Sequence, residues 1–542
     1  MQSLTSTQKR ILVILILLGL VYLSLFAFPN NTGAKDPMMI SLFEPDEFAQ
    51  YTVVANMLTP RETLSKTIVN FLAYRQYYYG STFYVTSALL VLPIKLAQNF
   101  SNTQLIMLLL REAISVLPML AALLLLTYSQ TKFKSYFRTI FIFVFLLSIT
   151  AVVENDLWWH PDSIAIFFVA LTFFFLDRDN LRFGLNFFLA AASVGLATGT
   201  KVIGLFFFLT IPTYLIAGLI SKRLTWRKLF LRAAAFVSIL VAMIFISNPF
   251  LFLPSQFFRA IFIMSQQSAA MSSGWTVAYA KGPLSWWPIL QNLYGSLILI
   301  ALAFIALGFG IWRGQNRILH LLILAWIVPF SLYILYVVAI KPTHFFLPIV
   351  LPLYSSLVVL FEFPPFTPRE NASHAQKWSG WMLGAIVSAV LGYQFFVFIQ
   401  KDINLYQGVL TREQGNQALA FYDTLASQVL PRIQSDKQLV VYRDVRMYFP
   451  NRSGWHVLTF WNSSYSMLTS VNPDVLILWR QRIYDYTQQG AQQNALDPVS
   501  FQDMYQFYVD ASQDKLKGYH LVYQNSIGLM FVSNALYQKF FQ

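Results

Sequence analysis

The 542-residue chain contains no cysteine, and only 11% of its residues are charged. The missing thiol groups exclude disulfide bonds, thiol nucleophiles and metal sites with cysteine ligands. A water-soluble globular protein carries about 25% charged residues, so the low charge excludes that class for most of the chain. The sequence also has no internal repeat and no low-complexity tract, so neither a repeat architecture nor a compositionally biased linker is expected.

Hydrophobic residues make up 56% of the chain, and its mean hydropathy is +0.54. Apolar runs of about 17–25 residues are long enough to cross the hydrocarbon core of a bilayer. We therefore predict a polytopic α-helical membrane protein with about eleven transmembrane helices. They are expected at residues 11–28, 111–128, 137–153, 163–177, 183–199, 202–220, 229–247, 292–312, 318–338, 344–361 and 378–399.

The net charge of +14 would also suit a nucleic-acid partner. However, the excess of Lys and Arg falls in short loops between the apolar runs, which is typical of membrane orientation. This pattern excludes nucleic acid as a partner and predicts a cytoplasmic N-terminus. The long loops 29–110 and 248–291 and the tail 400–542 are then expected on the extracytoplasmic face.

Residues 81–97 are apolar enough to span a bilayer, but they contain Pro93 and Lys95. If this segment were counted as a span, every later loop would change sides and the loop-charge bias would be lost. We therefore predict a re-entrant or interfacial helix here.

Two domains are predicted from this pattern, a transmembrane domain over 1–399 and a soluble extracytoplasmic α/β domain over 400–542. Short β-type runs at 438–442, 475–479 and 529–533 are separated by helical and polar stretches, which indicates a small α/β domain.

External acidic residues cluster at two places. Asp46 and Glu47 follow Glu44-Pro45 in the first long loop, and Asp156, His160 and Asp162 occupy the loop after 137–153. A carboxylate held beside a binding surface can accept a proton from a hydroxyl group. The structural alternative is that these acidic residues only begin helices, where negative charge complements the helix dipole.

Basic side chains predicted on the same face are Arg75, Lys201, Lys341 and His344. Each can extend toward the headgroups or bind anionic lipid without further function. Together they would also suit a lipid-linked phosphate.

An ordered set of motifs resembles the GT-C superfamily of membrane glycosyltransferases. The likeness is greatest to the branch that contains the protein O-mannosyltransferases and the lipid A aminoarabinose transferase, and it covers about residues 1–400. The matching pieces are Asp46-Glu47, Tyr79-Gly80, Arg111, His160-Pro161-Asp162, Gly195–Lys201 and His344–Pro348.

This resemblance implies a polyprenyl-phosphate sugar donor and transfer to a glycan, lipid or protein acceptor on the extracytoplasmic face. Asp46 matches the family's catalytic acidic position, with Glu47 beside it. Either Asp156 or Asp162 would be the acidic partner in the second loop. Direct displacement with Asp46 as base would invert the anomeric centre. A divalent cation is left open, and the cytoplasmic membrane of a prokaryote is favoured over the endoplasmic reticulum.

Two other function classes fit the composition. A transporter or flippase for a lipid-linked or anionic solute usually has ionisable groups near the bilayer midplane, whereas these spans are almost free of charge. An adhesion or scaffold protein that displays the α/β tail would leave the acidic loops unexplained. The sequence therefore favours the transferase.

Overall fold

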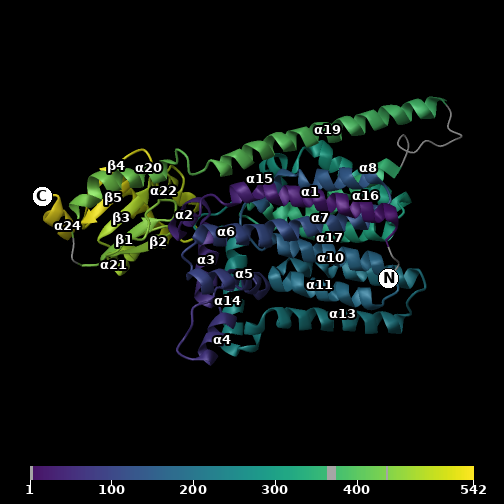
Figure 1. Cartoon of the computed structure of the whole chain (residues 1–542), viewed down its shortest axis with the longest axis horizontal. Coiled ribbons are helices and arrows are strands. Elements are labelled where there is room, and N and C mark those ends of the chain that lie inside the picture. The colour runs from purple at the N-terminus through teal and green to yellow at the C-terminus, as the bar shows by residue number, and fades with distance from the viewer. Residues whose placement is uncertain (1–3, 363–373, 435–436) are drawn as a thin grey trace.

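The computed structural model describes residues 4–362, 374–434 and 437–542 and is mainly helical. A bundle of long helices forms one part, and a smaller α/β unit forms the other, at one end of the bundle next to α2 (Figure 1). The predicted domain ranges also include 1–3, 363–373 and 435–436, which lie outside the described residues.

Seven helical segments within the described residues are long and apolar enough to cross a membrane. Two further pairs qualify if each bent pair is one span, with bends of 61° and 85°, which gives up to nine. The chain is therefore an integral, multi-pass membrane protein. The seven segments are Ser6–Asn30 (α1), Thr103–Thr131, Val202–Ile220, Trp226–Ser247 (α13), Arg317–Tyr336 (α17), Thr343–Glu362 and Trp381–Leu410, and the bent pairs are Tyr136–Leu147 (α8) with Thr150–Asp156 (α9) and Pro283–Tyr294 with Leu297–Arg313 (α16).

Helices α10 (Asp162–Asp179) and α11 (Leu185–Thr200) coincide with two further predicted spans but fall outside that count. Helix α10 carries charged residues at both ends, and α11 is short. The total of eleven transmembrane helices therefore stays a prediction. The remaining bundle elements are α6 (Thr103–Leu110), η1 (Arg111–Val116), α7 (Leu117–Thr131), η2 (Val202–Phe208), α12 (Thr210–Ile220), η3 (Pro249–Phe252), α14 (Pro254–Ser273), α15 (Pro283–Ile289), η4 (Leu290–Tyr294), η5 (Thr343–Phe346), α18 (Leu347–Ser355) and η6 (Ser356–Glu362).

The first long loop folds into short helices against the end of the bundle (Figure 1). They are α2 (Pro37–Phe43), α3 (Pro45–Met57), α4 (Leu64–Leu72) and α5 (Ser81–Gln98). Helices α2 and α3 each begin with proline, which is favoured at a first helical position, and the Asp36 carboxylate caps α2. Helix α5 is not among the candidate spans, and its re-entrant or interfacial placement stays a prediction.

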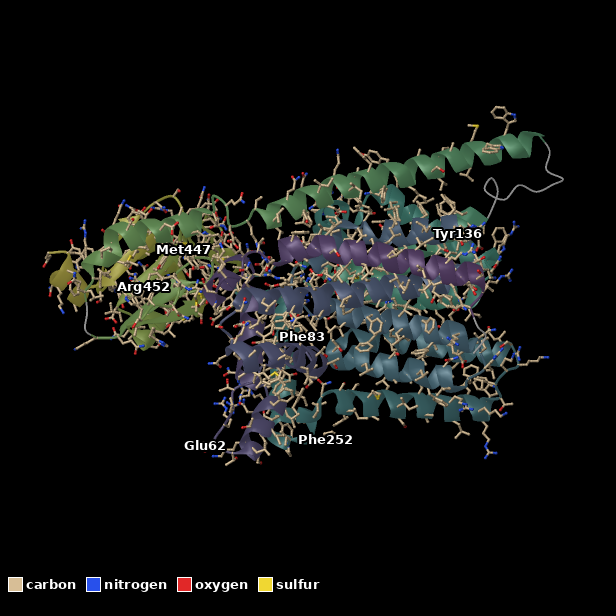
Figure 2. All side chains as sticks on the ribbon, in the orientation of Figure 1. Glu62, Phe83, Tyr136, Phe252, Met447 and Arg452 are labelled. Carbon is tan, nitrogen blue, oxygen red and sulfur yellow. The ribbon has the colours of Figure 1, made fainter. Side chains whose placement is uncertain are left out.

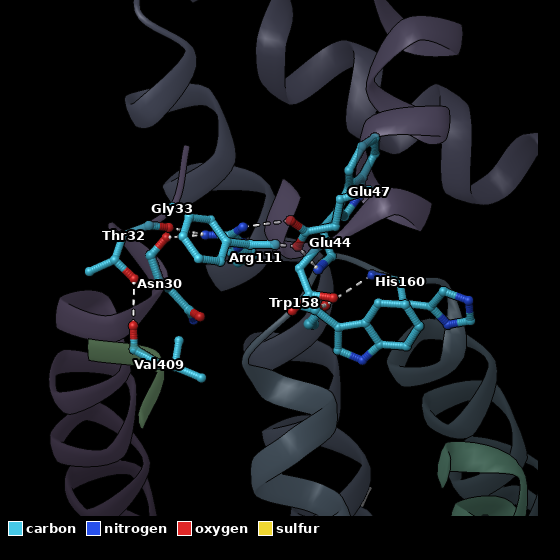
Figure 3. Close-up of polar contacts among 12 residues, drawn as sticks. Asn30, Thr32, Gly33, Glu44, Glu47, Arg111, Trp158, His160 and Val409 are labelled. Atoms are coloured by element: carbon cyan, nitrogen blue, oxygen red, sulfur yellow. Dashed lines mark hydrogen bonds and ion pairs between the residues drawn. The ribbon is translucent and has the colours of Figure 1, made fainter. Parts of the chain in front are cut away.

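A fully buried ion pair, Glu47 with Arg111, connects this loop to the bundle (Figure 3). Arg111 begins the π-helical turn η1, a local widening of a helix that often occurs at functional positions. Its Nε donates to Glu47 Oε1 at 2.8 Å, and its Nη1 donates to the carbonyl oxygens of Asn30 and Thr32 at 2.8 and 2.9 Å. The Trp159 backbone N–H also donates to Glu47 Oε1, at 2.6 Å. One pair thus holds four segments together.

The α/β unit contains a five-stranded sheet in the order β2-β1-β3-β5-β4. β1 is parallel to β2 and β3, whereas β5 is antiparallel to β3 and β4. The three inner strands match the predicted runs, and the two edge strands were not predicted. The elements are α20 (Gln417–Thr424), η7 (Leu425–Val429), η8 (Leu430–Arg432), β1 (Leu439–Asp444), β2 (Trp455–Phe460), α21 (Tyr465–Val471), β3 (Val475–Trp479), α22 (Arg480–Thr487), η9 (Gln492–Asn494), α23 (Pro498–Ser512), β4 (Tyr519–Gln524), β5 (Gly528–Ser533) and α24 (Asn534–Phe540).

Helix α19 (His374–Leu410) leads from the bundle into the α/β unit and continues past the predicted boundary at 399. Just after it, Arg412 Nε donates to Thr32 Oγ1 at 3.1 Å, and Glu413 Oε1 accepts from the Gly33 N–H at 2.6 Å. These contacts attach the start of the α/β unit to the first loop. The exact boundary and the extracytoplasmic position of the unit stay predictions.

We predict that Glu47→Gln lowers the free energy of unfolding by about 3–5 kcal/mol, because it leaves the Arg111 charge buried without its counter-ion. Asp46→Asn is the matched control, since Asp46 is exposed in the first turn of the same helix and the loss of its charge near the helix N-terminus costs at most about 1 kcal/mol. Denaturation of both variants in the same detergent checks this. Equal stability of Glu47→Gln and wild type would show that the pair is not a main support of the loop.

Candidate functional site

A cavity of about 630 Å³ lies between the first loop and the bundle. Most of its wall is apolar and comes from η2, α13, α14 and α17, with side chains such as Phe206, Met264 and Phe330. Its polar residues include Tyr79, Asp162 and Lys201. The cavity therefore offers a mostly apolar surface with the charged side chains of Asp162 and Lys201 at its wall, which suits an amphiphilic ligand.

Asp162 is the centre of the polar cluster at this cavity. It is the first residue of α10, and it is 2% exposed. Lys201 Nζ donates to its Oδ1 at 2.6 Å, His160 Nδ1 contacts its Oδ2, and His344 Nε2 lies 3.4 Å from Oδ2. The fold thus brings together four of the residues singled out in the sequence, from three different segments of the chain.

His160 connects Asp162 with Tyr79. Burial lowers the pKa of His160 below its usual value, against the opposing effect of Asp162. The ring is therefore neutral near pH 7, and its Nδ1 lies against Asp162 Oδ2. The Tyr79 hydroxyl forms a hydrogen bond with His160 Nε2 at 2.7 Å. Trp158 stacks on the His160 ring with centroids 4.2 Å apart and holds its plane.

Two glycines let the segments that carry Tyr79 and Lys201 approach each other. A Cβ on Gly80 would lie 1.5 Å from the Gly199 carbonyl oxygen, so no larger residue fits. Asn248 bridges the two segments, because its Nδ2 donates to Gly199 O at 3.0 Å and its Oδ1 accepts from the Ser81 N–H at 2.8 Å. This close backbone contact fixes the distance across the polar end of the cavity.

Asp46 is exposed in the first turn of α3. No hydrogen bond or ion pair engages its carboxylate within the described part of the chain. It lies within electrostatic range of Tyr79 and His160. Among the acidic residues of the first loop, Asp46 thus has the geometry of a group that is available to a ligand.

The two other acidic residues beside Asp46, Glu47 and Glu44, each lie next to an arginine. Glu47 is occupied by Arg111 and the Trp159 backbone, so its carboxylate is not available. Glu44 lies 3.7 Å from Arg412, and burial followed by repulsion from Glu47 raises its pKa to about 7, against the lowering effect of Arg412.

Asp156 is the last residue of α9 and has different partners from Asp162. Tyr22 donates to its Oδ2 at 3.0 Å, and Asn30 Nδ2 donates to its backbone oxygen at 3.0 Å. Of the two candidate second-loop acids, only Asp162 lines the cavity.

Two of the predicted phosphate-binding side chains also lie elsewhere. Arg75 is exposed, with a left-handed backbone (φ 67°), and does not line the cavity. Lys341 donates to the Ala280 carbonyl oxygen at 2.8 Å and lies 4.7 Å from the centre of the Trp286 ring. His344 is next to Asp162, as described above.

The donor atoms of His160, Asp162 and His344 lie within 4.8 Å of one another, so these side chains could hold a metal ion. Imidazole and carboxylate ligands suit Zn²⁺ and similar divalent ions. The Lys201 ammonium group already neutralises one oxygen of Asp162, so an ion would share this carboxylate with Lys201.

Sequence reasoning did not assign roles to Tyr79 and Arg111, although both belong to the matching motifs. Tyr79 has no charge or motif spacing that indicates a contact with a histidine 81 positions away. In the sequence, Arg111 is simply a basic residue at the start of a predicted span. Only the folded chain shows their partners.

The Glu44 pKa predicts a pH-dependent change in stability. In the unfolded chain the pKa of the Glu44 carboxyl group is about 4.3. Its pKa is higher in the folded protein, so the folded protein binds the Glu44 proton more tightly. The contribution of Glu44 to stability is then fully present below about pH 4 and is lost as the pH rises through about 7. Wild type should lose thermal stability relative to Glu44→Gln between pH 5 and pH 8. A difference that is constant over this range would contradict the shift.

Comparison with protein-family models finds no match, and comparison with curated proteins finds none either. Solved structures do match. ArnT from Cupriavidus metallidurans bound to undecaprenyl phosphate is 11% identical, over 97% of this chain and 98% of that chain, with a TM-score of 0.53. The apo form of that protein is 12% identical over the same shares, with a TM-score of 0.49. An Archaeoglobus fulgidus oligosaccharyltransferase tethered with an acceptor peptide is 10% identical over 95% and 74% of the two chains, with a TM-score of 0.48.

The likeness to undecaprenyl-phosphate-bound ArnT extends over nearly the whole of both chains, but at 11% identity it shows the fold alone. The chain has the fold of the GT-C membrane glycosyltransferases, as the ordered sequence motifs predicted.

Proposed function

We propose that this protein is a glycosyltransferase that moves a sugar from a polyprenyl-phosphate donor to an acceptor hydroxyl group. The observation that carries the proposal is the position of Asp46, an exposed carboxylate without a partner in the described chain, near the polar end of a mostly apolar cavity. In keeping with the loop charges, we place the reaction on the extracytoplasmic face of a cytoplasmic membrane.

The cavity has the properties that a lipid-linked donor needs. Its wall is predominantly apolar, and it is formed partly by α13 and α14, which expose large hydrophobic side chains such as Val241 and Phe258 on their other faces. A polyprenyl chain can therefore leave the cavity toward the membrane without exposing its apolar surface to water.

The donor phosphate would bind at Lys201, with His344 beside it. Lys201 is 18% exposed and is held by Asp162, so its ammonium group is positioned but still accessible. A cation placed beside the leaving group stabilises the negative charge that develops on it. Arg75 and Lys341 neither line the cavity nor contact Asp162, whereas His344 contacts Asp162, and we therefore give Arg75 and Lys341 no part in this step.

The reaction follows from these positions. Asp46 accepts the proton of the acceptor hydroxyl while its oxygen bonds to the anomeric carbon. The bond between that carbon and the phosphate oxygen breaks, and its electron pair leaves with the polyprenyl phosphate. A single displacement of this kind inverts the anomeric configuration.

His160 and Tyr79 would position the sugar or its phosphate rather than exchange protons. Asp162 fixes the His160 ring, and the ring orients the Tyr79 hydroxyl at the cavity wall. A divalent ion, if one binds at His160, Asp162 and His344, would add positive charge beside the phosphate.

Asp46→Asn should lower the rate of transfer by about two to four orders of magnitude, the usual effect of losing a general base. Donor binding and thermal stability should change little, because the cavity and Lys201 are untouched. Purified protein with labelled polyprenyl-phosphate sugars and candidate acceptors provides the assay. Near-normal transfer by this variant would rule out Asp46 as the base, and donor translocation without transfer in wild type would favour a flippase.

Lys201→Gln should raise the KM for the donor more than it changes the unfolding temperature. Lys341→Gln removes a charge from the same predicted face but outside the cavity, so it is the matched control. We expect a donor KM at least about tenfold higher in Lys201→Gln, the effect of losing one charge-assisted hydrogen bond. Equal donor KM values in the two variants would leave Lys201 a purely structural partner of Asp162.

A further inference from the structure

The α/β unit presents the ligand-binding edge of its sheet to the first loop. Strands β1, β2 and β3 are parallel, so their carboxyl ends share one edge. The chain passes from β1 to β2 on one side and returns to β3 on the other, which makes the β1–β3 border a topological switch point. In open α/β sheets, ligands bind outside the carboxyl ends of the strands at such a point.

Contacts show where this edge lies. Arg446, two residues after β1, donates through Nη1 to the carbonyl oxygens of Leu42 and Phe43 at 3.1 and 3.0 Å. These carbonyls belong to the end of α2, directly before Glu44 and Asp46. Figure 1 shows α2 between the sheet and the bundle. The carboxyl edge therefore faces the segment that carries the proposed base.

Two arginines at this edge have unused hydrogen-bond donors. Asp444, the last residue of β1, is completely buried and accepts from Arg482 Nε at 3.2 Å. Within the described residues, both terminal nitrogens of Arg482 and the Nε and Nη2 of Arg446 make no hydrogen bond. Arg482 is 21% exposed, so its free donors can reach a ligand.

The charges around these arginines are of both signs. Arg446 lies within electrostatic range of Arg482 as well as of Glu44, Asp444 and Asp46. Two guanidinium groups repel each other, and Asp444 is already engaged with Arg482. An anionic group that bridges both would relieve this repulsion and use the free donors in the forked geometry that suits phosphate and carboxylate.

We propose that the carboxyl edge of this sheet is the acceptor subsite and that Arg446 and Arg482 bind an anionic group of the acceptor, a phosphate or a carboxylate. This inference rests on the proposed transferase function. It gives the α/β unit a direct part in the reaction, because it places the acceptor between the sheet and Asp46. It also separates the two substrates, with the donor phosphate at Lys201 and the acceptor anion at the arginines.

The test measures anion binding without any sugar transfer. Full-length protein is saturated with undecaprenyl phosphate, which fills the proposed donor site, and is then titrated with inorganic phosphate while the unfolding temperature is followed. We expect a saturable rise in wild type and in Lys201→Gln. The apparent Kd should be about tenfold or more higher in Arg446→Gln and in Arg482→Gln, as expected for the loss of charge-assisted hydrogen bonds.

Arg452→Gln is the matched control. Arg452 is an exposed arginine just before β2, at the amino end of the parallel strands (Figure 2). Its removal changes the net charge by the same amount and should leave phosphate binding unchanged. If Arg482→Gln fails to fold because Asp444 is left unpaired, Arg482→Lys keeps a positive charge there and should still bind phosphate more weakly than wild type.

Unchanged phosphate binding in the Arg446 and Arg482 variants, or an equal loss in Arg452→Gln, would overturn the proposal. The two proposals can fail separately. Phosphate binding at the arginines in a protein that transfers no sugar would leave the subsite standing without the transferase. Sugar transfer with an unaltered acceptor KM in both arginine variants would support the transferase and exclude the acceptor subsite at the arginines.

Discussion

The rest of the structure depends on the buried pair between Glu47 and Arg111. A guanidinium group in a bundle interior must be neutralised and hydrogen-bonded, and here one carboxylate and two backbone carbonyls do both. Because these partners belong to α1, the first loop, η1 and the segment before α10, the pair fixes their relative positions. His160 and Asp162 directly follow Trp159, and α2, which receives the α/β unit, belongs to the first loop.

Asp46 and Glu47 are adjacent in α3 but have different roles, because successive side chains of a helix point in directions about 100° apart. Glu47 points into the protein and meets Arg111, whereas Asp46 points outward and has no partner in the described chain. The dipeptide thus supplies a structural acid and an accessible acid from one turn. Asp162, buried beside Lys201, anchors a cation and orients a histidine.

The contact between the α/β unit and the bundle is made largely of arginines on backbone carbonyls and hydroxyls. Arg443 Nη2 donates to Ser41 Oγ at 2.6 Å, and Tyr448 donates to Asp36 Oδ2 at 2.6 Å, both on or beside α2. Such contacts are directional, so they set the orientation of the sheet as well as its attachment. As a result its carboxyl edge lies over the loop that carries Asp46, and a reaction at that residue would take place between the two parts.

The sequence by itself determined the class of the protein, most of its helices and the inner strands, because these depend on local hydrophobicity and periodicity. Ordered motifs also indicated the GT-C fold. The edge strands β2 and β4 escaped prediction because polar residues interrupt their apolar pattern and only pairing with β1 and β5 stabilises them. Only the tertiary structure could separate Asp46 from Glu47 and Asp162 from Asp156, since identical carboxylates differ in their partners, which come from distant segments.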